Sequence, residues 1–100
     1  MTKEQPEQTP QPLFALGQVV ATPGALDTLR EAGIDPSALL TRHVTGDWGE
    51  LPEEDLEANR EALAQGYRLL SNYPLETGER VWIITEWDRS YTTLLRPDEY

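Results

Sequence analysis

The chain has 100 residues and 18 acidic side chains against eight lysines and arginines, so its formal net charge is −10. This length suits one domain with a single core, and the acidity argues against direct capture of DNA or RNA, which requires a basic surface. Cysteine is absent, which excludes disulfides, thiolate metal sites and a cysteine nucleophile. No apolar run approaches the ~20 residues of a membrane helix, and residues 1–12 lack the apolar core of a secretion signal. We therefore expect a cytoplasmic protein without a membrane span.

Residues 1–12 consist mainly of Gln, Glu, Pro and Thr. Such a segment cannot bury enough apolar surface to offset the entropy lost on ordering, which predicts a disordered tail followed by one domain over residues 13–100. The apolar run 13–21 is interrupted by Gly17, and we interpret it as a strand at a sheet edge.

Two helices are predicted next, each by a capping residue followed by proline. Thr22-Pro23 begins a helix over residues 23–32, with inward residues Ala25, Leu26 and Leu29, and Gly33 closes it. Asp35-Pro36 begins a second helix that ends near Gly46 and has Leu39, Leu40 and Val44 along one face. The short connection predicts a tight helical hairpin.

A third helix is predicted from Pro52 to Gly66. Glu53, Glu54 and Asp55 suit its N-terminal dipole, while Leu56, Ala62 and Leu63 face inward. The preceding segment 46–51 has two glycines around Asp47-Trp48, which allows a sharp turn anchored by a large ring.

Three consecutive strands are predicted at residues 68–75, 81–87 and 91–95, because these segments are rich in β-branched and aromatic side chains. Gly78 can adopt the left-handed conformation of a short hairpin loop. A three-residue loop at 88–90 would pair Thr85 with Thr93 and Ile83 with Leu95, although the loop has no glycine and a slip by one residue remains open. The predicted fold is α+β, with N-terminal helices on one face of a three- to four-stranded antiparallel meander.

Several segments together resemble a family of small bacterial proteins. They are His-Val-Thr-Gly-Asp-Trp-Gly at 43–49, Glu54-Asp55, Asn59, Trp-Ile-Ile-Thr-Glu at 82–86, Asp-Arg-Ser at 88–90 and Pro-Asp-Glu-Tyr at 97–100. The family is carried largely on plasmids and other mobile elements, and its members are described as plasmid-related or type I restriction-associated. The resemblance spans residues 17–100. It implies a mobile-element accessory protein and assigns no catalytic role.

Acidic residues concentrate between positions 47 and 61, where seven carboxylates accompany Arg60 alone. We interpret this segment as an outward anionic face that contacts a protein partner, such as a basic nucleic-acid-binding protein. A nucleic-acid mimic of the antirestriction or anti-defence type is one version of this hypothesis. The candidate binding residues are Asp47, Trp48, Glu50, Glu53, Glu54, Glu57, Glu61 and Asp88.

A metal-independent ribonuclease is the alternative hypothesis. Cleavage of RNA through its own 2′-hydroxyl needs a base, an acid and a cation near the phosphate, and His43, Glu86, Arg89 and Thr92 are residues of the right types. Helices followed by an antiparallel meander also resemble the barnase and RelE-like fold, although fold does not determine function. For His43 the competing interpretation is an exposed or capping residue near the C-terminus of the second helix, where a cation interacts well with the dipole.

The same residues also permit purely structural roles. Glu86, Asp88 and Arg89 can satisfy one another and the turn backbone, and Arg89 can bridge to a carboxylate of the third helix or of the loop at 46–49. Asp47, Glu50, Glu54 and Asp55 are hard oxygen ligands, but their spacing matches no EF-hand loop, and a single histidine without cysteine disfavours zinc. We therefore predict neither a metal nor a cofactor.

Overall fold

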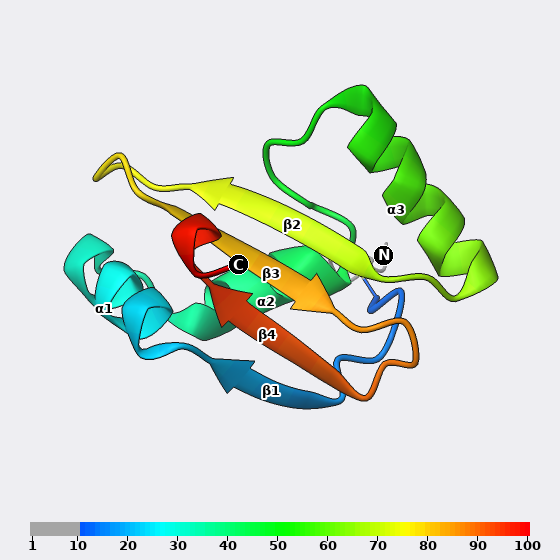
Figure 1. Cartoon of the computed structure of the whole chain (residues 1–100), viewed down its shortest axis with the longest axis horizontal. Helices are drawn as coiled ribbons and strands as arrows, with labels where there is room; N and C mark the ends of the chain where they lie inside the picture. Colours follow the sequence, from blue (N-terminus) through cyan, green and yellow to red (C-terminus); the bar gives the residue numbers. More distant parts are fainter. Residues whose placement is uncertain (1–10) are drawn as a thin grey trace, which may run out of the picture.

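The computed structural model describes residues 11–100, which form a four-stranded sheet with helices on one face and along one edge (Figure 1). The strands are β1 (Gln18–Ala21), β2 (Leu69–Pro74), β3 (Arg80–Thr85) and β4 (Tyr91–Leu95), in the spatial order β1-β4-β3-β2. The predicted α+β class is confirmed. The tail predicted over residues 1–12 lies, apart from its last two residues, outside the described residues.

The helices are α1 (Pro23–Ala32), α2 (Pro36–Val44) and α3 (Glu53–Gln65). The predicted N-caps of α1 and α2 are confirmed. The Thr22 hydroxyl accepts from the Ala25 amide, and the Asp35 carboxylate accepts from the Ser37 amide. α2 ends two residues before the predicted Gly46. On α1, Thr28 is buried while Leu26 is 40% exposed, so the prediction of an inward Leu26 is wrong.

The sheet is mixed, which corrects the purely antiparallel prediction. β1 runs parallel to β4, whereas β4, β3 and β2 are antiparallel neighbours. Parallel strands need a long crossover, and all three helices together with β2 and β3 separate β1 from β4 in the chain. The strand predicted within residues 13–21 does lie at a sheet edge, but the prediction assumed antiparallel pairing throughout and so missed its parallel orientation.

The β3–β4 hairpin differs from its predicted register by one residue. Thr85 pairs with Thr92 and Ile83 with Leu94, which places both threonines on the helix-covered face. Arg89 has φ +59°, so it adopts the left-handed conformation that a glycine would normally supply in such a loop. The loop can therefore contain one more residue than predicted.

The main core lies between the sheet and the first two helices. Its buried members are Ala25, Leu29, Leu39, Tyr73, Leu75, Val81, Ile83 and Leu94. Figure 1 shows α2 behind the sheet and only the C-terminal turn η1 (Pro97–Glu99) in front of it. The helices therefore cover one face of the sheet.

A second, smaller core attaches α3 to the β2 side of the sheet. Trp48, Ala62 and Leu69 are buried there, and Phe14, Leu51, Leu56 and Leu63 pack against them. The predicted anchoring role of the Trp48 ring is confirmed, since only 7% of this residue is exposed.

Candidate functional site

The outward side of α3 carries most of the exposed charge of the candidate face. The helix has five carboxylates and one arginine, and Glu53, Glu54, Glu57 and Glu61 are all exposed. Arg60 Nη1 lies 2.6 Å from Glu57 Oε1 and 3.2 Å from Glu53 Oε2. Glu54 and Glu61 have no ion-pair partner among residues 11–100. The face therefore remains anionic after its internal pairing.

Side-chain hydrogen bonds hold α3 in place against β2. The Asn59 amide nitrogen donates to the Leu70 carbonyl over 2.8 Å, and the Leu70 amide donates to the Asn59 carbonyl oxygen over 3.2 Å. Asn59 is 3% exposed and Ala62 is completely buried. These contacts fix the inner side of the helix, so its outer carboxylates are presented on a firmly attached support.

The loop before α3 behaves differently, because arginines neutralise its acids. Asp47 accepts from Arg42 Nε over 2.7 Å and from Arg42 Nη2 over 3.2 Å, and this guanidinium lowers the pKa of the Asp47 carboxyl. Glu50 Oε1 lies 2.7 Å from Arg80 Nη2. The predicted anionic surface between positions 47 and 61 thus narrows to α3.

The structure also assigns structural contacts to Trp48 and Asp88. Trp48 is buried in the smaller core, so its ring is not presented to solvent. The Asp88 carboxylate accepts from the Ser90 amide over 3.1 Å, and hydrogen bonds from Ser90 lower the pKa of the Asp88 carboxyl. Asp88 is exposed, so this carboxylate remains accessible while it shapes the loop.

His43 lies at the centre of a buried polar network. It is 0% exposed, which overturns the interpretation as an exposed residue at the helix end. Its Nδ1 lies 2.6 Å from Ser71 Oγ and its Nε2 lies 2.9 Å from Thr85 Oγ1. Thr85 Oγ1 in turn lies 2.7 Å from Thr92 Oγ1, and the Thr92 hydroxyl donates to the Leu16 carbonyl. The network joins α2 to three strands and to the segment before β1.

The Leu16 carbonyl at the end of this network fixes the position of one imidazole proton. A hydroxyl has one proton, so Thr92 donates it to Leu16 and must accept from Thr85. Thr85 then accepts from His43 Nε2–H. Burial lowers the pKa of His43 to about 4, so near pH 7 the imidazole is neutral and its Nδ1 accepts from the Ser71 hydroxyl.

Arg89 is committed to backbone carbonyls. Its Nη1 donates to the carbonyls of Tyr67, Glu86 and Trp87 over 2.6, 3.0 and 3.2 Å, and its Nη2 donates to the Ala62 carbonyl over 3.1 Å. This guanidinium therefore joins the β3–β4 loop to the C-terminal turn of α3, where a cation interacts favourably with the helix dipole.

The four ribonuclease candidates do not form one accessible constellation. His43 and Thr92 share the buried network through Thr85. The Phe14 ring contacts both His43 and Arg89. Its centroid lies 5.2 Å from the centroid of the His43 ring and 5.6 Å from Arg89 Cζ. Glu86 has no side-chain hydrogen bond or ion pair within the described range. A buried imidazole cannot meet an RNA hydroxyl, so this geometry does not favour the ribonuclease hypothesis.

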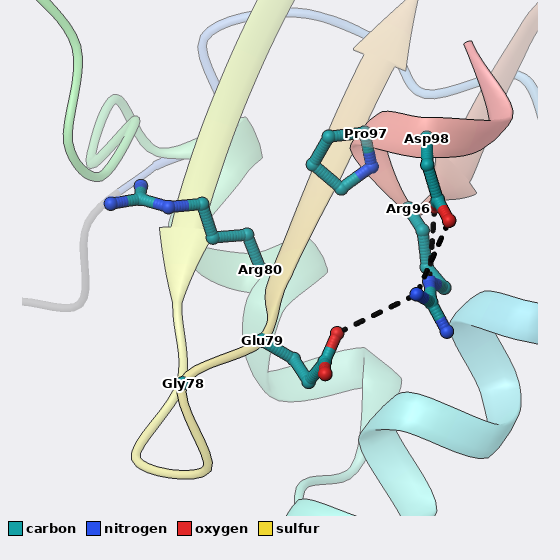
Figure 2. Close-up of a pocket in the computed structure, with 6 residues that line it drawn as sticks. All are labelled: Gly78, Glu79, Arg80, Arg96, Pro97 and Asp98. Atoms are coloured by element: carbon teal, nitrogen blue, oxygen red, sulfur yellow. Dashed lines mark hydrogen bonds and ion pairs between the residues drawn. The ribbon is translucent and has the colours of Figure 1, made fainter.

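Figure 2 shows a surface pocket of about 290 Å³ beside the C-terminal turn. Arg96 lies between two carboxylates, with Nη2 3.7 Å from Glu79 Oε1 and Nε 3.1 Å from Asp98 Oδ1. Arg80 points away from this group toward Glu50. The two arginines that line the pocket are balanced by its two carboxylates, Glu79 and Asp98, so the pocket presents no net positive charge to an anionic ligand.

Within residues 11–100, no group of three or more His, Asp or Glu side chains is arranged to hold a metal ion. Over the same residues, every helix is too short or too polar to span a bilayer.

No protein-family model matches the chain, and neither curated proteins nor solved structures gave a significant similarity.

Ser71 and Thr85, the hydrogen-bonding partners of His43, were not predicted from the sequence. A signal was present, because both are polar residues at alternating inward positions beside Leu69, Tyr73 and Ile83. A polar side chain on a buried strand face normally has a hydrogen-bonding partner, and His43 is the only histidine in the sequence.

Proposed function

We propose that this chain is a non-enzymatic accessory protein of a bacterial mobile element that acts by contact between α3 and a basic protein. The observation that carries the proposal is the row of exposed carboxylates at Glu53, Glu54, Glu57 and Glu61 on a helix anchored by Asn59. The mobile-element setting rests on the resemblance of residues 17–100 to the plasmid-related family.

The spacing of these carboxylates supports a nucleic-acid-mimic version of the proposal. Glu53, Glu57 and Glu61 recur every four residues, which is about 6 Å along a helix axis. Alternate phosphates of one DNA strand are separated by about 6.8 Å of axis. An arginine-rich groove that binds DNA would therefore meet charges at a similar interval.

The internal ion pairs of α3 do not prevent such binding. The side chains of Arg60, Glu53 and Glu57 are each more than half exposed, and exposed pairs contribute roughly 0–1 kcal/mol. A partner arginine that forms a bidentate hydrogen bond with a carboxylate can replace them.

The test is affinity capture from a bacterial extract with a charge-reversed helix. Glu54→Lys with Glu61→Lys should abolish capture of nucleic-acid-binding proteins, and duplex DNA should release those captured by the unchanged chain. The matched control is Glu31→Lys with Glu76→Lys, which makes the same change in net charge at exposed positions outside α3. Equal capture by both variants would contradict the proposal, and capture that DNA cannot displace would contradict its nucleic-acid-mimic version.

A further inference from the structure

The two edges of the sheet differ in how their backbone groups are hydrogen-bonded, and the edge at β2 is closed. The outward backbone groups of Leu70 bond to the Asn59 side chain. The Asn72 amide donates to the Trp48 carbonyl over 3.0 Å, and the Asn72 carbonyl accepts from the Glu50 amide over 2.8 Å. Figure 1 shows α3 and the preceding loop beside this strand. No further strand can add at these positions.

The opposite edge, at β1, is open. The amides of Gln18 and Thr22 donate to the carbonyls of Ser90 and Leu94, each over 3.0 Å, and so point toward β4. Because successive backbone groups alternate across a strand, those of Val19 and Ala21 point outward. They have no hydrogen-bond partner in residues 11–100, and Figure 1 shows no element beyond β1.

The side chains of β1 provide no protection against pairing. Edge strands are commonly guarded by charges, prolines or bulges, and Gln18–Ala21 contains no charge or proline. Val19 is 43% exposed and Val20 is 39% exposed. The edge therefore combines unpaired backbone with accessible apolar side chains.

We propose that a second copy of this chain pairs with β1 in antiparallel orientation, around a two-fold axis at Val20. Val19 of one copy then lies opposite Ala21 of the other, and each such pair exchanges two N–H···O=C bonds. This two-fold pairing gives a partner to the N–H and the C=O of both Val19 and Ala21 in each copy. The edge is therefore self-complementary, as a two-fold interface requires. The product is one eight-stranded sheet in which the two Val20 side chains are cross-strand neighbours.

The distribution of charge explains why two copies with net charge −10 can approach at this edge. Neighbouring strands are ~4.8 Å apart, so the two β2 strands would be about 34 Å from one another, with the acidic α3 helices at the far sides. Charges separated by more than ~8 Å are largely screened at physiological ionic strength. Four-residue strands form a small interface, so we expect a weak dimer that depends on protein concentration.

Amide hydrogen exchange of the full chain, at low and high protein concentration, tests the register directly. The amides of Val19 and Ala21 should gain protection as concentration rises, while the Gln18 amide, already bonded to Ser90, should be protected throughout. Sedimentation velocity at the same concentrations should show a shift from monomer to dimer. A chain that stays monomeric, or a dimer without protection at Val19 and Ala21, would overturn the proposal.

A lysine at the two-fold axis provides the matched variant. Val20→Lys places two cations opposite each other and should remove the dimer, although it lowers the net negative charge of each copy. Tyr67→Lys makes the same change at a side chain that is 55% exposed and lies on the β2 side of the sheet, and it should leave the dimer intact. Circular dichroism verifies that both variants fold. A dimer that survives Val20→Lys, or one that both variants remove, would place the contact elsewhere.

Discussion

His43 is the residue whose burial has the clearest thermodynamic consequence. Its pKa is about 4 in the folded chain, below the ordinary value of 6.5, because burial penalises the imidazolium. As pH falls below 6.5, the unfolded chain binds a proton that the folded chain still excludes. Stability that is fully present above pH 6.5 is therefore lost progressively toward pH 4.

We expect the free energy of unfolding to fall by on the order of 3 kcal/mol across this window, since each pKa unit corresponds to about 1.4 kcal/mol. Urea unfolding at pH 7 and pH 4.5 measures the change. His43→Gln removes the titrating group, so this variant should be less stable at pH 7 yet lose less stability on acidification. The same loss in both proteins would assign the acid sensitivity to other groups.

Beside the packing of the smaller core, Asn59 provides the side-chain hydrogen bonds that join α3 to β2. Asn59 supplies both a donor and an acceptor to Leu70, as a neighbouring strand would. Asn59→Ala leaves both backbone groups unpaired at a partly buried position, and we expect a loss of about 2 kcal/mol of stability. Denaturant unfolding checks the magnitude.

The matched variant Asn59→Asp separates the two hydrogen bonds. Its carboxylate still accepts from the Leu70 amide, but its second oxygen faces the Leu70 carbonyl and cannot donate to it. Because this repulsion lies at a residue that is 3% exposed, Asn59→Asp should lose more stability than Asn59→Ala in denaturant unfolding. Hydrogen exchange at the Leu70 amide should accelerate in Asn59→Ala. Unchanged protection in Asn59→Ala would show that packing in the smaller core alone closes the β2 edge.

Elements with local signals were the ones predictable from the sequence. The caps at Thr22 and Asp35 and the stops at Gly33 and Gly66 place the helices to within about two residues, because capping depends only on neighbouring residues. The parallel pairing of β1 was missed, since it joins residues more than 70 positions apart. No local pattern specifies such a contact.

The candidate site shows the same limit. Exposed acids on α3 follow from helical periodicity, whereas the pairing of Asp47 and Glu50 with arginines depends on where α2 and β3 lie. The register of the β3–β4 hairpin depended on Arg89 adopting φ +59°, which is uncommon for a residue other than glycine. That one conformation placed Thr92 within the His43 network.

The net charge of −10 destabilises the folded chain, because its like charges repel one another most strongly in the compact state. The ion pairs within residues 11–100 all involve exposed side chains, so each contributes little. We therefore expect the thermal unfolding midpoint to rise as salt is added, because screening weakens repulsion more than it weakens these pairs. Differential scanning calorimetry in increasing sodium chloride measures the effect.

The charge-reversed helix shows where this repulsion originates. Glu61→Lys, which lies away from the first turn of α3, should raise the midpoint at low salt, and its advantage over the unchanged chain should shrink as salt is added. Glu76→Lys alters net charge equally at an exposed site outside α3, so its gain should be smaller. A midpoint that falls with salt in the unchanged chain would mean that ion pairs outweigh repulsion. Equal gains in the two variants would mean that net charge, not its concentration on α3, sets the effect.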